Sequence, residues 1–193
     1  MKKRTALIIF FIFLIMYSYS QISPNAQIET FYFAENENFP NNPKLPVLLY
    51  KRVFDFGNTD DPASVVEHTF QKSNWAGSWR NGIYTFHHYH STAHEALSIY
   101  GGWAEVQLGG PNSKILRIEK GDLVVLPAGT AHKKIDSGDG FAVVGAYPDN
   151  QSWDMNYGKQ GEMEKAKQNI SKVKLPSQDP VFGTSGKMFD YWE

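Results

Sequence analysis

The sequence of 193 residues contains no cysteine, so the chain can be neither a cysteine-anchored lipoprotein nor a scaffold held together by disulfides. An excess of positive charge is also missing. After residue 20, 16 basic and 20 acidic residues remain, a net charge of −4, and no basic run is longer than Lys133-Lys134. Nucleic-acid binding and membrane-surface binding therefore have little electrostatic support. We expect a protein whose core holds it together without crosslinks.

Residues 1–20 have the pattern of a signal peptide. Lys2-Lys3-Arg4 forms a positive start, residues 5–17 are apolar, and small residues precede a cleavage position after Ser20. The apolar run is shorter than the roughly 18 residues that a membrane-spanning helix requires. The sequence predicts export to the periplasm or the medium, with no stable membrane insertion after cleavage. An uncleaved N-terminal anchor is the alternative.

The rest of the chain divides into three parts. Residues 21–60 form an N-terminal arm with short strands expected at 28–33 and 47–53. Residues 61–150 form a β-rich domain with a leading helix, for which Asp61 is a suitable N-cap and Pro62 a suitable first residue. Residues 151–193 contain a second helix, expected over 161–173, and an aromatic tail that we expect to dock on the domain.

Glycines punctuate short β segments throughout residues 78–148. Runs such as Leu123-Val124-Val125-Leu126 fill the gaps between them. Many short strands with evenly spaced turns are typical of an all-β sandwich or a closed barrel.

Five of the six histidines lie between residues 87 and 132. On a strand, His88 and His90 point to the same face, because side chains alternate. Glu95 from the next strand and His132 from another would complete a metal site. Such imidazole and carboxylate ligands suit one divalent ion, Fe, Mn, Zn or Ni, with Cu also compatible. A histidine pair on a strand is by itself more often a surface or core feature.

These residues belong to two longer patterns with fixed spacing. The first reads Gly82, five residues, His88, one, His90, four, Glu95, six, Gly102. The second reads Gly121, five residues, Pro127, one, Gly129, two, His132, with Asp136 where the pattern has Asn. Both match the cupin motifs at every other fixed position, and chance does not account for the pair.

The sequence therefore resembles the cupin superfamily, and most closely the small bacterial cupins of the YjlB-like group. The resemblance covers nearly all of the chain after residue 20, including segments 45–50, 79–84, 127–129, 144–148 and 179–183. It implies a mostly β fold, a cupin-type jelly-roll barrel (double-stranded β-helix) with one helix on its N-terminal side and one C-terminal helix. It implies a metal held inside by His88, His90, Glu95 and His132. It implies no particular substrate, because cupins have many functions.

One ligand is ambiguous, because cupins place the acid three or four residues after the second histidine of the motif. Either His94 or Glu95 could therefore be the fourth ligand. The register of Gly102 favours Glu95, which leaves His94 as a hydrogen-bond partner of the ligands or as an acid or base in the pocket. A site with four histidines is the alternative.

Alternation along the strand adds two candidates for catalysis. Tyr84 and Arg80 share the face of His88 and could contact a hydroxyl or carboxylate of a substrate. The alternative is that both pack or pair structurally within the barrel, which the sequence favours more for Arg80 than for Tyr84. The tryptophans at 79, 103 and 153 are expected in the core or at an interface and not as a sugar-stacking platform.

Two functions fit these observations. The first is a metal-dependent enzyme, of oxygenase or isomerase type, acting on a small polar molecule. The second is a non-catalytic module that binds a small ligand or a metal. Cupins often dimerise, so a homodimer is also expected.

Overall fold

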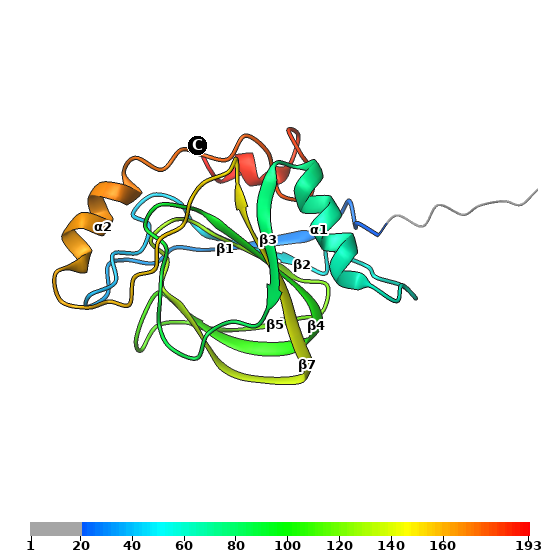
Figure 1. Cartoon of the computed structure of the whole chain (residues 1–193), viewed down its shortest axis with the longest axis horizontal. Coiled ribbons are helices and arrows are strands. Elements are labelled where there is room, and N and C mark those ends of the chain that lie inside the picture. The colour runs from blue at the N-terminus through cyan, green and yellow to red at the C-terminus, as the bar shows by residue number, and fades with distance from the viewer. Residues whose placement is uncertain (1–20) are drawn as a thin grey trace, which may run out of the picture.

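One antiparallel sheet dominates residues 21–193, which are the part of the chain that the computed structural model describes (Figure 1). The predicted signal peptide lies outside these residues. The strands are β1 (Gln27–Phe31), β2 (Val47–Lys51), β3 (Trp75–Asn81), β4 (Glu95–Leu108), β5 (Ile115–Glu119), β6 (Leu123–Leu126) and β7 (His132–Pro148). The helices are α1 (Pro62–Lys72), α2 (Glu162–Ile170) and a short 3-10 turn (Lys187–Asp190). Among residues 21–193, neither α-helix has the length and apolar character needed to cross a bilayer.

The strand order is β1-β2-β6-β4-β7-β3, with β5 paired to β4 outside this path. The predicted jelly-roll class is confirmed, with a helix before the long strands and one after them. The sheet curves strongly without closing (Figure 1). Within the described chain, β1 pairs only with β2 and β3 only with β7, so both remain edge strands. The segment 82–94 between β3 and β4 contributes two isolated bridges and no strand, which leaves the sheet open at that side.

The sharp bend of β4 against β7 requires a glycine. The register between these strands shifts on either side of Gly101, and Gly102 has a φ of 58°. A Cβ at Gly102 would lie 2.2 Å from the Gly138 carbonyl oxygen, a distance that no side chain tolerates. Gly82 of the same motif, by contrast, has no atom within 4 Å of such a Cβ.

In β2, β6 and the first part of β4 both faces of the sheet are buried, because successive residues alternate between two apolar clusters. On β2, Leu48 and Tyr50 face one cluster while Val47 and Leu49 face the other. The first cluster lies outside the curve and includes α1, of which Val66 is fully buried. The second cluster fills the inside of the curve and borders the candidate site.

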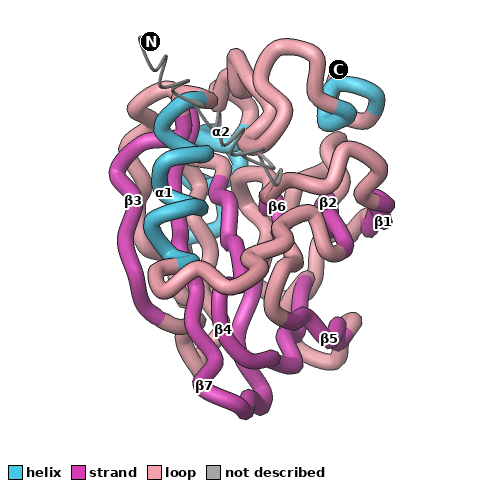
Figure 2. Tube along the Cα trace, turned by 90° about the vertical axis from the view of Figure 1, so that its right-hand side faces the viewer, coloured by secondary structure: helices cyan, strands magenta, loops and turns pink. Residues whose placement is uncertain are grey.

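Helix α1 begins as predicted. Asp61 is the N-cap and accepts a hydrogen bond from the Ser64 amide at 3.1 Å, and Pro62 occupies the first turn. Figure 2 shows α1 against the outer side of the sheet, beside the long strands. Val66 and Phe70 point inward from it, both fully buried. The helix thereby covers the outer face and leaves the inner face to the site.

The C-terminal segment packs on the same outer face. The Trp192 indole donates to the Pro46 carbonyl at 2.9 Å, and the Tyr50 hydroxyl donates to Asp179 at 2.7 Å. The segment 21–60, through β1 and β2, belongs to the same sheet as the long strands. One sheet therefore connects residues 21–60 with the long strands, and the C-terminal segment packs on the outer side of that sheet.

Candidate metal centre

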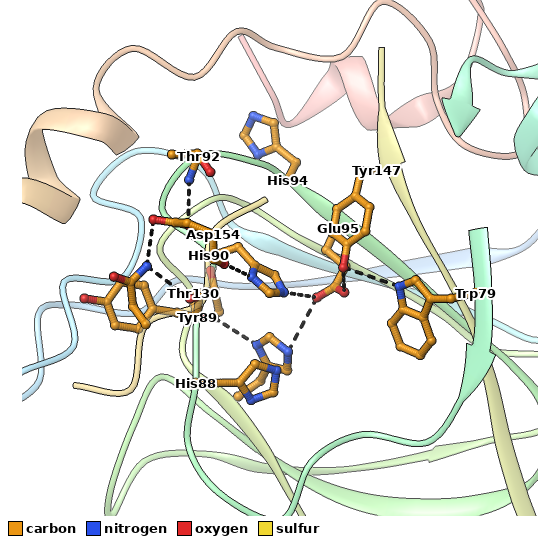
Figure 3. A network of polar contacts seen from close by, with 12 residues as sticks. Trp79, His88, Tyr89, His90, Thr92, His94, Glu95, Thr130, Tyr147 and Asp154 are labelled. Carbon is orange, nitrogen blue, oxygen red and sulfur yellow. Dashed lines mark hydrogen bonds and ion pairs between the residues drawn. The ribbon is translucent and has the colours of Figure 1, made fainter. Parts of the chain in front are cut away.

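A cavity of about 200 Å³ opens on the inner face of the sheet. Side chains from β3, β4 and β7 line it, together with the segments 82–90 and 153–155. The residues that determine its chemistry are His88, His90, Glu95, His132, Tyr147 and Trp153. Three imidazoles and a carboxylate therefore share one cavity, although His132 is more than 35 residues from the other three. Figure 3 shows His88, His90 and Glu95 close to one another.

His88 and His132 are direct neighbours across an antiparallel bridge. The His88 amide donates to the His132 carbonyl at 3.2 Å, and the His132 amide donates back at 3.0 Å. Their ring centroids are 4.1 Å apart. Each ring is oriented by a backbone carbonyl: Nδ1 of His88 lies 3.2 Å from the Phe86 oxygen, and Nδ1 of His132 lies 3.1 Å from the Thr130 oxygen.

His90 is held in the same way by a different part of the chain. Its Nδ1 makes a short hydrogen bond to the backbone carbonyl of Asp154, and its own carbonyl accepts from the Gly129 amide at 2.7 Å. The Asp154 side chain in turn accepts from the Ser91 amide at 2.6 Å. The segment after β7 thus fixes the orientation of His90.

Because a carbonyl can only accept, all three Nδ1 atoms must carry the proton. Each Nε2 then keeps its lone pair. A backbone carbonyl on the opposite nitrogen is the usual support of a metal-binding histidine, since it fixes both the tautomer and the ring orientation.

Glu95 lies between these rings. Its Oε2 atom is 3.6 Å from Nε2 of His90 and 3.5 Å from Nε2 of His132. Its Oε1 atom accepts a hydrogen bond from the Tyr147 hydroxyl at 3.0 Å, and that hydroxyl accepts from the Trp79 indole at 3.3 Å. Oε2 is buried and has no hydrogen-bond partner among residues 21–193. Tyr147 therefore fixes Oε1 of the carboxylate, whereas Oε2 can still bind a further partner.

The electrostatics favour an ionised carboxylate beside two neutral imidazoles, those of His88 and His132. Burial alone would raise the pKa of Glu95, but the neighbouring His90 and His132 lower it to about 2. Burial lowers the pKa of His88 to about 3 and also lowers that of His132. Burial also lowers the pKa of His90, but the neighbouring Glu95 carboxylate has the larger effect, and the pKa of His90 is raised overall. At neutral pH Glu95 is charged, and His88 and His132 present lone pairs.

The fit to a metal can be judged from these distances. Metal–ligand bonds of about 2.0–2.2 Å place neighbouring ligand atoms roughly 3.0–3.5 Å apart. The two distances from Glu95 Oε2, 3.5 and 3.6 Å, are close to that range. Within residues 21–193, however, no group of three or more His, Cys, Asp or Glu side chains stands in an arrangement that could hold an ion as it is. The imidazole and carboxylate donors, and the backbone carbonyls that orient the three rings, fit a metal ion. The four side chains would have to move closer together to bind it.

His94 lies away from this cavity, which corrects the expectation that it serves there as an acid, a base or a hydrogen-bond partner of the ligands. It precedes Glu95 by one residue, so its ring lies on the opposite face of the chain (Figure 3). Its Nδ1 accepts from the Ala128 amide at 3.0 Å, and its ring packs on Trp192, with centroids 4.8 Å apart. The same geometry gives no support to a site of four histidines.

Arg80 and Tyr84, the other predicted catalytic residues, both line the cavity. The Arg80 guanidinium, however, is engaged with Glu67 at 2.7 and 2.9 Å and with Asp61 at 3.2 Å. Its pairing with α1 is thus the structural alternative foreseen for it. Tyr84 is half exposed, packs edge-on against His88 and stacks on Phe86. Tyr84 remains available to a substrate.

Three aromatic residues of the site were not among the predicted catalytic or metal-binding residues. Tyr147 binds Glu95, and Trp79 binds Tyr147. Trp153, expected in the core or at an interface, is 47% exposed and lies against both His90 and Tyr147, with centroids 5.3 and 5.9 Å away. Strand parity could have indicated Tyr147, since it shares a face of β7 with the inward Val143, but nothing in the sequence places Trp153, which follows the strand.

Comparison with known proteins identifies a relative of similar length. The uncharacterized protein YjlB of Bacillus subtilis (strain 168) is 33% identical over 166 residues, which cover 86% of this chain and 97% of that protein. The chain belongs to the YjlB family. No protein-family model matches it. The predicted membership of the cupin superfamily agrees with the jelly-roll class of the chain and with both cupin motifs.

Two solved structures resemble parts of this YjlB-family chain. A DUF861 family protein from Thermotoga maritima is 28% identical, with a TM-score of 0.29, over 44% of this chain and 88% of that one. Procruciferin, an 11S globulin from Brassica napus, is 14% identical, with a TM-score of 0.34, over 81% of this chain and 37% of that one. TM-scores this low add nothing to the description of the YjlB-family fold.

Proposed function

We propose that this chain is an exported cupin that binds one divalent metal ion through His88, His90, Glu95 and His132 and acts on a small polar molecule. The observation that carries the proposal is the set of three imidazoles whose Nδ1 atoms are all tied to backbone carbonyls around one buried, half-satisfied carboxylate. A barrel that needed only to fold would gain nothing from burying these groups together, because buried charge costs free energy.

A bound divalent ion would supply a Lewis acid or a redox centre, consistent with oxygenase or isomerase chemistry. The chain's own residues prepare the cavity for a small molecule. Tyr147 holds Glu95 in one orientation, and Trp153 offers an exposed ring beside His90. Tyr84 lines the same cavity and is half exposed. The ring faces would bind the flat or apolar side of a ligand and exclude water from it.

The first experiment measures the metal content of the purified protein by mass spectrometry, alone and as His88→Ala and His132→Ala. We expect about one ion per chain in the unaltered protein and a loss of most of it in both variants. His68→Ala is the matched control, because His68 lies exposed on α1, away from the cavity. Equal metal content in all four proteins would overturn the proposed centre.

A second candidate function is a binding module without catalysis. Two observations favour it: His94 lies outside the cavity, and Arg80 is engaged by acidic residues of α1 and its N-cap. Metal-loaded protein would be tested for O₂ uptake and for turnover of a panel of sugars and small acids. Turnover supports the enzyme, whereas stoichiometric metal with no turnover and saturable ligand binding supports the module.

Export and self-association complete the proposal. The signal pattern of residues 1–20 supports export, and N-terminal sequencing of protein recovered outside the cytoplasm should begin at Gln21. The unpaired side of β1 supports a homodimer formed through edge pairing. Light scattering on the purified protein would give twice the monomer mass if the dimer forms.

A further inference from the structure

A second and larger cavity, of about 900 Å³, lies outside the sheet. Its walls are the segments 32–35 and 40–45, the C-terminal end of α2 and the residues that follow α2. Apolar side chains contribute much of its lining, including Phe33, Leu45, Ile170 and Val173. It shares no lining residue with the metal cavity. A cavity of this size is in the range of small-molecule sites.

His94 is one of the buried polar residues that line this cavity, and unlike Asn41 and Asn42 it has a side-chain nitrogen without a hydrogen-bond partner among residues 21–193. Because Nδ1 accepts a hydrogen bond from the Ala128 amide, the proton of the neutral ring must be on Nε2. His94 is 1% exposed, and its Nε2 has no hydrogen-bond partner among residues 21–193. The Lys174 carbonyl is close enough to favour a charged ring, but it does not meet hydrogen-bond geometry with Nε2. A buried donor without an acceptor is costly. A ligand oxygen would remove that cost once the side chains that cover Nε2 move aside, because the atom itself is buried.

The charges around the cavity decide what kind of acceptor fits. Lys44 and Lys167 contribute two positive charges to its lining, while Glu35 and Glu193 contribute two negative ones. Lys167 is already paired with Glu35. An anionic ligand would therefore gain no net attraction and would lose its hydration.

We propose that this cavity binds a small neutral molecule with an apolar chain and a carbonyl oxygen, which accepts a hydrogen bond from His94 Nε2. The chain of the ligand packs on Leu45, Ile170 and Val173. The ring of His94 is already held for this contact by Ala128 on one side and by Trp192 on the other. This site is independent of the proposed metal centre.

The test titrates the purified protein with octanamide by calorimetry. We expect saturable binding, and about tenfold weaker binding to His94→Asn, which corresponds to the loss of one hydrogen bond. The Asn oxygen can still accept from Ala128, but its amide nitrogen stops short of the Nε2 position. Val173→Phe, which places a larger side chain in the wall where the apolar chain of the ligand packs, should weaken binding. Octanoate should bind more weakly than octanamide.

The outcomes separate this site from the metal centre. His94→Asn should keep the metal content of the unaltered protein, and His132→Ala should keep its affinity for octanamide. Equal affinity of the unaltered protein and His94→Asn, or no binding up to the solubility of octanamide, would overturn the proposal. If His94→Asn fails to fold, the ¹⁵N shift of His94 Nε2 in the unaltered protein decides, since octanamide must move it.

Discussion

Tyr147→Phe is the change that tests how Glu95 is held in the cavity. The Tyr147 hydroxyl donates to buried Oε1 at 3.0 Å, and burial together with Glu95 raises the pKa of this tyrosine, which keeps its proton in place. The variant removes a hydrogen bond to a charged group, worth about 1.5–3 kcal/mol. It also leaves the Trp79 indole without its acceptor.

We expect two measurable results. Metal affinity, obtained by competition with a chromophoric chelator, should fall roughly 10- to 100-fold, as is usual when a partner of a ligand is lost. Metal-free protein should lose about 1–3 kcal/mol of unfolding free energy in urea titrations, because a buried acceptor is left unmet.

Tyr84→Phe is the matched control. Tyr84 lines the same cavity, but its hydroxyl makes no hydrogen bond to residues 21–193, so this variant should change neither quantity appreciably. If Tyr147→Phe binds metal and unfolds as the control does, the idea that Tyr147 positions Glu95 is wrong.

Three further predictions concern stability. Gly102→Ala should lower the free energy of unfolding by at least about 1–2 kcal/mol, because φ is positive there and the Gly138 carbonyl oxygen blocks a Cβ. Gly82→Ala should be nearly neutral, and thermal melts of the two variants in parallel compare them. Burial lowers the pKa of His94 to about 4 from 6.5, so below pH 6.5 the unfolded chain binds a proton that the folded chain refuses. Unfolding free energy should therefore fall by up to about 1.4 kcal/mol per pH unit from 6.5 to 4, and urea titrations of His94→Asn should lack this component of the slope. Phe70→Ala, in the fully buried face of α1, should cost about 3–5 kcal/mol in the same titrations, and a loss below about 1 kcal/mol would contradict the packing described.

Much of the candidate site was predictable because motif spacing is a local property. His88 and His90 are separated by one residue, Glu95 begins the next strand, and the second motif provides His132. Helix α1 was predictable for the same reason, since Asp61, Pro62 and the apolar residues that follow interact within a few turns.

The role of His94 was not predictable with the same certainty. Spacing alone allowed either His94 or Glu95 to face the imidazoles. Pairing of β4 with β6 and β7 determines which face of the strand is inside, and it places Glu95 inside and His94 outside.

By itself, the sequence indicated an all-β sandwich or barrel, because alternation and turn chemistry act between near neighbours. Its two spaced motifs carried the resemblance that implied the jelly-roll class, and they contain all four candidate metal-binding side chains. Only the tertiary structure decided which partners those side chains have. Arg80 pairs with α1, Tyr147 supports Glu95 and the Asp154 carbonyl orients His90. These contacts join residues 13 to 64 positions apart in the chain, so they depend on how the sheet curves and where the segments after it dock.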